Sequence, residues 1–158
     1  ALEHKNEIIS AIIYDPCRDE MFFSEKGKGA YLNDTRLRVS GRKKMIETIY
    51  STGLPFAKDT NLIKTTDDLS RLLPQCAGVR RFGAAALDLA YVAAGRFDGF
   101  WERGLKPWDI AAGLLIVRES GGLVETIDEN NKLLQDDDII AGNGEIFEQF
   151  SKIIRGKS

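Results

Sequence analysis

The spacing of hydrophobic residues changes about one third of the way along the chain. Up to residue 56, short runs of alternating or β-branched residues are separated by turn residues such as Asp15-Pro16 and Asn33-Asp34. This pattern is typical of short strands joined by tight turns. We expect strands at residues 8–14, 20–24, 30–32, 35–39 and 46–52. The first part of the chain therefore predicts an antiparallel meander.

From residue 61 onward, longer apolar segments alternate with short ones. Leucines at helical spacing, an Ala-rich stretch and stop signals at Pro and Gly predict helices at residues 61–73, 84–94, 110–120 and 145–154. Short β-branched or aromatic runs predict strands at residues 79–82, 97–101, 123–127 and 139–141. A meander followed by alternating strands and helices indicates a layered α/β fold, in which an antiparallel sheet precedes a smaller mixed sheet with helices.

Composition, charge and the few Cys and His residues exclude several classes of protein. The 158 residues are 43% hydrophobic and 29% charged, which suits one compact domain and not a disordered chain. No apolar run approaches the roughly 20 residues that cross a bilayer, so we expect no membrane partner. A formal net charge of -2 argues against general nucleic-acid binding. Cys17 and Cys76 lack a CxxC partner and indicate free thiols in a reducing cytoplasm, while a single histidine, His4, excludes a multi-histidine metal site.

Small residues stand where a predicted strand enters a predicted helix, at Gly83, Ala84 and Ala85. Such residues leave the amides of the first helical turn bare, and bare amides attract phosphate or hydroxyl oxygens. Small residues also let a buried helix pack closely against its neighbours. The residues alone leave both interpretations open.

Two carboxylates, Glu102 and Asp109, flank a turn that contains Gly and Pro, between an apolar strand and an apolar helix. In one interpretation Asp109 is the N-cap of the helix, a role worth about 1 kcal/mol, and Glu102 pairs with Arg103 or Lys106 at the surface. In the other, Asp109 holds a hard divalent cation through a carboxylate oxygen. The acidic run 136–138, by contrast, predicts a solvated turn before a strand.

Several segments of the second half carry a recognisable pattern. They are Gly-Ala-Ala-Ala-Leu-Asp-Leu at the start of 83–102, Trp-Asp-Ile-Ala-Ala-Gly within 106–113, and Arg-Glu-Ser-Gly-Gly at 118–122. Together they resemble the inositol monophosphatase family, in the variant of its bacterial SuhB-type members. Residues 14–16, 25–33 and 52–56 are similar to further family segments, so the resemblance covers nearly the whole chain. It implies the layered α/β sandwich of the sugar-phosphatase type.

The resemblance implies a role for each matching residue. Asp109 matches the family's catalytic, metal-binding Asp, which also lies close to the substrate. Glu102 matches the glutamate that accepts hydrogen bonds from the inositol ring hydroxyls, and Gly83, Ala84 and Ala85 match the helix-start residues that line the substrate. The family often has Thr or Ser where Ala84 stands, so a side-chain contact is lost there. The implied activity is Mg²⁺-dependent hydrolysis of myo-inositol monophosphate to inositol and phosphate by a cytoplasmic homodimer.

The chain also departs from the family pattern. Family members carry, upstream, a Gly-Glu-Glu element and an Asp-Pro-x-Asp-Gly-Thr motif that supply most metal ligands, and neither occurs here. We therefore expect residues 1–56 to be the C-terminal part of an antiparallel-sheet half that is truncated upstream. Residues 57–158 are expected to form the α/β half with the substrate and metal residues, and this fragment alone is expected to be inactive.

Two alternatives to that activity stay open. The first is a phosphatase of the same superfamily that acts on fructose bisphosphate, histidinol phosphate or a nucleotide 3′-phosphate. The second is a non-catalytic module that dimerises or binds another protein.

Overall fold

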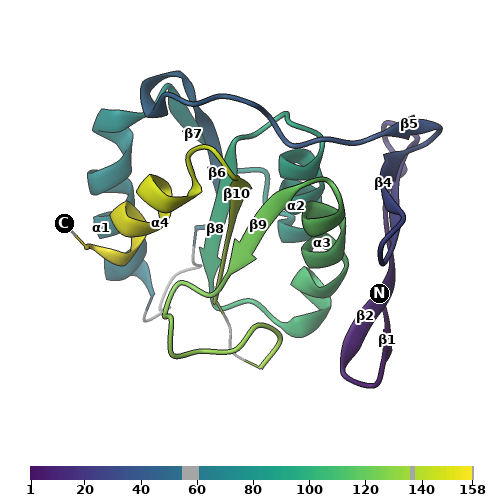
Figure 1. The fold of residues 1–158 in the computed structure, drawn as a ribbon. Helices are drawn as coiled ribbons and strands as arrows, with labels where there is room; N and C mark the ends of the chain where they lie inside the picture. Colours follow the sequence, from purple (N-terminus) through teal and green to yellow (C-terminus); the bar gives the residue numbers. More distant parts are fainter. Residues whose placement is uncertain (55–60, 136–137, 158) are drawn as a thin grey trace.

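The computed structural model describes residues 1–54, 61–135 and 138–157, which form two β-sheets and four α-helices (Figure 1). The strands are β1 (Leu2–His4), β2 (Glu7–Asp15), β3 (Glu20–Glu25), β4 (Gly29–Leu32), β5 (Thr35–Arg36), β6 (Ile49–Thr52), β7 (Gly78–Arg80), β8 (Gly99–Arg103), β9 (Gly122–Glu125) and β10 (Asp138–Asn143). The helices are α1 (Leu62–Leu72), α2 (Ala85–Ala93), α3 (Pro107–Glu119) and α4 (Phe147–Arg155). Short 3₁₀ turns cover Met45–Glu47 and Leu73–Gln75.

The first sheet is an antiparallel meander in the order β1-β2-β3-β4-β5, and the predicted meander is confirmed for β2 to β5. The last strand expected in this part of the chain, β6, joins the second sheet instead. One of its faces is buried, so Ile13 and Phe22 lie in the core while Ile12 and Tyr14 on the other face are exposed. This alternation is the signal that reveals a half-buried strand. Strand β1 is not among the predicted elements, because all three of its side chains are exposed and no alternation marks it.

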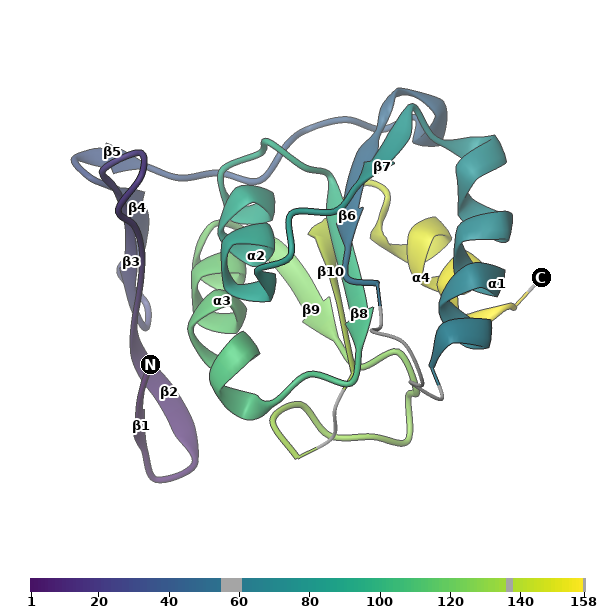
Figure 2. The same cartoon turned by 180° about the vertical axis from the view of Figure 1, so that it is seen from behind.

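The second sheet is mixed, in the order β7-β6-β8-β10-β9. Strand β6 runs parallel to both β7 and β8, whereas β10 is antiparallel to both β8 and β9. Helices α2 and α3 lie between the two sheets, and α1 and α4 cover the opposite face of the mixed sheet, as both views show (Figures 1 and 2). The layered α/β fold predicted from the sequence is therefore confirmed.

Buried side chains on both faces of β8 hold the layers together. Phe100 belongs to the buried apolar cluster between the two sheets, which also contains Leu89 of α2 and Phe22 of β3. Trp101, the next residue, packs with Phe150 in the core beneath α1 and α4. Burying one large apolar side chain stabilises a fold by roughly 1.5–3 kcal/mol. Because β8 is fixed from both sides, the residue that follows Trp101 is held in a defined place.

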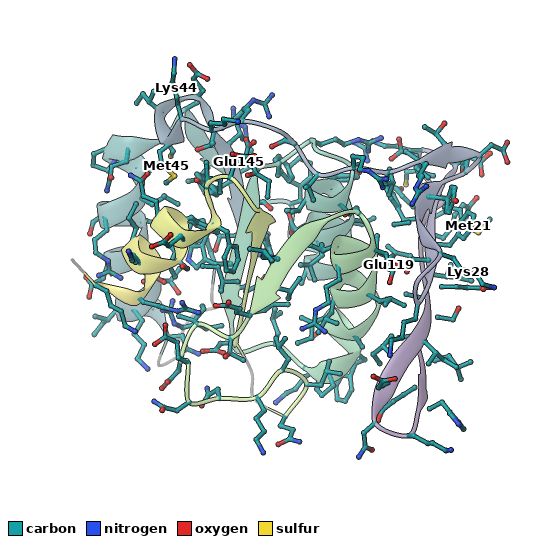
Figure 3. All side chains as sticks on the ribbon, in the orientation of Figure 1. Met21, Lys28, Lys44, Met45, Glu119 and Glu145 are labelled. Atoms are coloured by element: carbon teal, nitrogen blue, oxygen red, sulfur yellow. The ribbon has the colours of Figure 1, made fainter. Side chains whose placement is uncertain are left out.

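A carboxylate on α3 ties the helix layer to the antiparallel sheet. Glu119 accepts hydrogen bonds from the backbone N–H groups of Gly27, at 2.8 Å, and Gly29, at 2.9 Å. Both glycines have positive φ values, 77° and 87°, which other residues adopt only with strain. Figure 3 shows Glu119 between α3 and the antiparallel sheet. The end of α3 is thereby anchored to the turn between β3 and β4.

Several predicted strands differ in extent from the observed ones; the strand expected at 97–101, for example, is Gly99–Arg103. The segment 46–52 begins within a 3₁₀ turn and becomes strand only from Ile49, and the segment 35–39 is strand only at Thr35–Arg36. Among the described helices, none combines the length and the apolar character that crossing a membrane requires. The division of the chain into residues 1–56 and 57–158 stays a prediction.

Candidate active site

The predicted site residues lie at one end of the mixed sheet. The carboxyl ends of the parallel strands β6 and β8 point to this end, and helices α2 and α3 both begin there (Figures 1 and 2). Ligands of α/β proteins bind where parallel strands end and the following helices begin. The topology therefore places two groups at the same end of the mixed sheet: the small residues before α2 and the two carboxylates around the β8–α3 turn.

The start of α2 leaves its amides without a side-chain cap. Ala84 is the N-cap residue, in an extended conformation, and its side chain has no oxygen to accept a hydrogen bond. Gly83, just before it, has φ 84°, a value that favours glycine. Gly83 and Ala84 are exposed and Ala85 is half-buried, so the first helical turn is open to a ligand.

Glu102 stands at the end of β8, half-buried, with its carboxylate against Gly53. A Cβ atom added to Gly53 would overlap the carboxylate group of Glu102. The expected surface pairing is absent: among the described residues, no ion pair joins Glu102 to Arg103 or Lys106. Arg103 instead pairs with the buried Asp68 on the other face of the sheet. The interpretation of Glu102 as a surface residue that pairs with Arg103 or Lys106 is therefore wrong.

Burial and neighbouring charge change the acidity of Glu102. Burial is the main cause that raises its pKa to about 7, and the negative charges of Asp88 and Asp109 raise it further. The positive charge of Arg81 opposes this rise. Glu102, Asp88, Asp109 and Arg81 therefore lie within electrostatic reach of one another, although they come from different elements. Such perturbed carboxyls are characteristic of functional sites.

Asp88 is a second buried acid of this region, on the first turns of α2. It is 1% exposed, and neither of its carboxylate oxygens accepts a hydrogen bond from the described part of the chain. Burial raises its pKa to about 6, while the nearby hydroxyl of Ser51 offsets part of that rise. A buried carboxylate without hydrogen bonds is costly to ionise, so the charged form of Asp88 lowers the stability of the folded protein.

Asp109 lies within the first turn of α3 and not before it. The N-cap is Lys106, followed by Pro107 at the first helical position, so the prediction of Asp109 as N-cap is wrong. Its Oδ2 accepts a hydrogen bond of 2.8 Å from the backbone N–H of Lys106, which is the reciprocal bond of a capping box. This bond fixes the half-buried carboxylate, and within the described part of the chain no hydrogen bond engages its Oδ1.

The donor set at Asp109 fits one ligand of a magnesium ion. Mg²⁺ prefers carboxylate oxygens and keeps several waters, so a single protein carboxylate in a fixed position is a suitable partial site. Within the described ranges, no three His, Cys, Asp or Glu side chains converge to form a complete metal site. Asp109 therefore fits the metal only together with ligands from other residues.

A cavity of about 550 Å³ lies elsewhere in the fold, between α1, the end of α4 and the segment before β10. None of the predicted site residues lines it. Cations on its wall are engaged in ion pairs, as Arg71 is with Asp68 and Arg155 is with Glu129. The first pair lies within α1, but Arg71 also donates hydrogen bonds to the carbonyl oxygens of Ile153 and Ile154 on α4, and the second pair joins α4 to the neighbouring loop. These contacts serve the packing of the fold.

The acidic run before β10 is only partly described. Asp136 and Asp137 lie outside the described residues. Asp138 is buried, and its carboxylate accepts hydrogen bonds from the backbone N–H groups of Ile127, at 3.2 Å, and Asp128, at 3.1 Å. The prediction of a solvated turn is therefore wrong for Asp138, which orders the loop after β9.

Sequence reasoning singled out Glu102, Asp109 and the start of α2, and the structure brings them to the same end of the mixed sheet. It missed Gly53 and Asp88. A signal for Asp88 was present, since a charged residue inside an Ala-rich, apolar helix calls for an explanation. No local signal marked Gly53, because the carboxylate that fills its Cβ position belongs to a distant strand.

Comparison with known proteins gives a consistent picture. Residues 1–157 match the inositol monophosphatase family. An inositol-1-monophosphatase of Mesorhizobium japonicum is 45% identical over 155 residues, which cover 98% of this chain and 58% of that protein. A Nus factor SuhB of Pseudomonas aeruginosa is 47% identical over 149 residues, covering 93% of this chain and 55% of that protein.

Solved structures agree. The crystal structure of the extragenic suppressor protein suhB from Bartonella henselae matches 97% of this chain and 59% of its own, with a TM-score of 0.92 and 42% identity. An inositol monophosphatase from Anabaena matches 93% of this chain and 58% of its own, with a TM-score of 0.83 and 36% identity. The chain thus spans a little over half the length of these relatives. It belongs to the inositol monophosphatase family.

Proposed function

We propose that the full-length protein is a Mg²⁺-dependent phosphomonoesterase that hydrolyses myo-inositol monophosphate to inositol and phosphate. The observation that carries the proposal is the meeting of Glu102, Asp109 and the uncapped start of α2 at one end of the mixed sheet. Family membership and a relative named inositol-1-monophosphatase support the same activity.

The proposed roles follow from the chemistry of each group. A phosphate monoester is a dianion, and bound Mg²⁺ supplies neutralising charge and lowers the pKa of a bound water. Asp109 holds the metal through the carboxylate that the Lys106 N–H fixes in place. The exposed amides at Gly83, Ala84 and Ala85 line the substrate, because the positive end of α2 attracts its oxygens.

Glu102 takes the substrate hydroxyls in this proposal. A carboxylate accepts hydrogen bonds from two neighbouring hydroxyls, and bonds to a charged acceptor are worth about 1.5–3 kcal/mol. Because burial raises the pKa of Glu102 to about 7, its charged form increases as the pH rises through 7. Hydroxyl recognition by this residue is therefore expected to strengthen over the same range.

We further propose that this chain alone does not catalyse the reaction. Its described residues offer no complete cluster of metal-ligating side chains, and the two upstream family motifs do not occur in its sequence. In this proposal, residues 1–56 and 57–158 correspond to parts of two structural halves, and the missing ligands come from the part of the family fold that carries those two motifs. We also propose that the protein is a cytoplasmic homodimer. Sedimentation of the full-length protein as a monomer would contradict the dimer.

The test is phosphate release by the purified full-length protein. We expect turnover of myo-inositol 1-phosphate only with Mg²⁺, and a higher kcat/KM than for fructose 1,6-bisphosphate, histidinol phosphate or a nucleotide 3′-phosphate. Asp109→Asn is expected to lose most turnover, whereas Asp34→Asn, an exposed change in the β4–β5 turn, serves as the matched control. A preference for another of these phosphate esters would replace inositol monophosphate as the substrate.

A second candidate function is a non-catalytic interaction. Relatives that are 46–47% identical carry the name Nus factor SuhB instead of a phosphatase name, which supports a separate, non-catalytic activity. The Asp109→Asn variant separates the two functions, because it removes a metal ligand at the site and leaves the remaining surface unchanged. If that variant loses phosphatase activity and still complements a strain that lacks the protein, the interaction is the biological role.

A further inference from the structure

The backbone conformation at position 53 does not require a glycine. Its φ lies outside the left-handed region, so another residue could adopt its conformation without strain. The constraint comes from space, since the Cβ position of Gly53 is already filled by the carboxylate of Glu102. Gly41 and Gly144 differ in this respect, because a Cβ atom at either would meet no atom within 4 Å.

The local structure explains why these two residues meet. Strand β6 runs parallel to β8, with Thr52 opposite Trp101, so Gly53 comes next to Glu102 just beyond the paired segment. The hydroxyl of Thr52 donates a hydrogen bond of 2.6 Å to the carbonyl oxygen of Trp101 and joins the two strand ends. The carboxylate of Glu102 therefore rests on backbone that is held rigidly.

Electrostatic repulsion is a second constraint on the position of the Glu102 carboxylate. Helix α2 packs against both β6 and β8 and carries the buried, unbonded carboxylate of Asp88. Its negative charge acts on Glu102, and among the described residues the other charges that act on Glu102 are Asp109 from α3 and Arg81 from the segment before α2. A repelled carboxylate avoids Asp88, which favours the position against Gly53.

We propose that Gly53 and Asp88 form a socket that positions the carboxylate of Glu102 toward the substrate hydroxyls. Gly53 supplies the space and Asp88 supplies the repulsion, and neither touches the substrate. Both are positioning residues. The inference rests on the proposed function, because it assigns a purpose to the orientation of the residue that takes the polyol.

The test is a double-mutant cycle in the full-length protein, with Gly53→Ala, Glu102→Ala and both changes together. The clash in Gly53→Ala is with the end of a flexible side chain, so we expect the protein to fold and the carboxylate to be displaced. Loss of a charged hydrogen-bond acceptor corresponds to about a 10- to 100-fold rise in KM for inositol 1-phosphate. We expect Gly53→Ala and Glu102→Ala to show this rise equally, the double variant to be no worse, and Gly41→Ala to match wild type.

If Glu102→Ala raises the KM, then a native KM in Gly53→Ala, or a further rise when Gly53→Ala is added to Glu102→Ala, would overturn the proposal. A substrate-free measurement separates it from the proposed function. Titration of ¹³C-labelled Glu102 by NMR is expected to give a pKa of about 7 in wild type, and a lower one in both Gly53→Ala and Asp88→Asn. An unchanged pKa in both variants refutes the socket. If instead the pKa falls but Glu102→Ala leaves the KM unchanged, the socket stands and the assignment of Glu102 to substrate hydroxyls fails.

Discussion

Replacing Asp88 by Asn should raise the stability of the protein relative to wild type as the pH rises through the range in which the carboxylate of Asp88 ionises. Asn has nearly the same shape and carries no charge, so the change removes the cost of a buried, unbonded carboxylate. The pKa of Asp88 is raised from 3.8 to about 6 by burial. A group whose pKa is raised by folding contributes its full stability below the unfolded pKa, and this contribution is lost as the pH rises through the folded value.

The size of the expected change in stability follows from the shift in the pKa of Asp88. About two pKa units correspond to roughly 3 kcal/mol, at 1.36 kcal/mol per unit. Part of this difference has already developed at pH 4, because the carboxyl of Asp88 in the unfolded chain is then about half ionised. The unfolding free energy of Asp88→Asn relative to wild type should therefore increase by about 2.5 kcal/mol between pH 4 and pH 8, with most of the change between pH 4 and pH 6. In a protein of this size that corresponds to about 5–10 °C in Tm.

The assay is urea unfolding of wild type and variant at one-unit pH intervals from 4 to 8, without metal. The new amide also lacks partners, so the constant offset between the two proteins is not informative and only its change with pH is read. Asp34→Asn, at an exposed turn, controls for general effects of net charge. Stability curves of Asp88→Asn and wild type that run parallel over this range would refute the reasoning.

Three further predictions concern the site and the layer contacts. Glu102→Gln should weaken substrate binding and change selectivity while Mg²⁺ affinity is kept, and calorimetric titrations with substrate and metal check both; an unaltered substrate profile would contradict the role. Substrate affinity of wild type should increase as the pH rises through about 7 and that of Glu102→Gln should not, because ionisation of Glu102 causes the increase; identical pH profiles would count against it. Glu119→Ala should leave the N–H group of the buried Gly29 without an acceptor, while the exposed N–H of Gly27 bonds to water, and should lower the unfolding free energy by about 1–3 kcal/mol. Urea unfolding measures this change, and a wild-type midpoint would show that the contact of Glu119 with the β3–β4 turn is not stabilising.

The sequence predicted most elements because burial leaves a periodic trace. The strand expected at 8–14 is β2, since one of its faces is buried and the other is exposed. This periodic pattern is missing where no face of an element is buried, and it is ambiguous where a buried residue belongs to a turn. Strand β1 exposes every side chain, and the segment before Ile49 buries Met45 within a 3₁₀ turn, which local periodicity does not distinguish from a strand.

The candidate site was predictable only in part, for a similar reason. Glu102 and Asp109 stand out because a charged residue next to apolar elements is conspicuous in a sequence. The start of α3 was misplaced although Pro107 marked the first helical position, a preference that Pro shows at helix starts. Gly53 could not be found, because its constraint is a contact with a side chain from another strand and exists only after β6 and β8 have paired.

The central claim is that Asp109 and Glu102 belong to a working phosphatase site. The most direct test is the rate of phosphate release from myo-inositol 1-phosphate by the full-length protein with Mg²⁺, compared between wild type and Asp109→Asn. We predict that the variant keeps the wild-type Tm and loses about 100-fold or more in kcat, because the charge that holds the metal is gone. Wild-type turnover in Asp109→Asn, or no turnover by the wild-type protein, would contradict the claim.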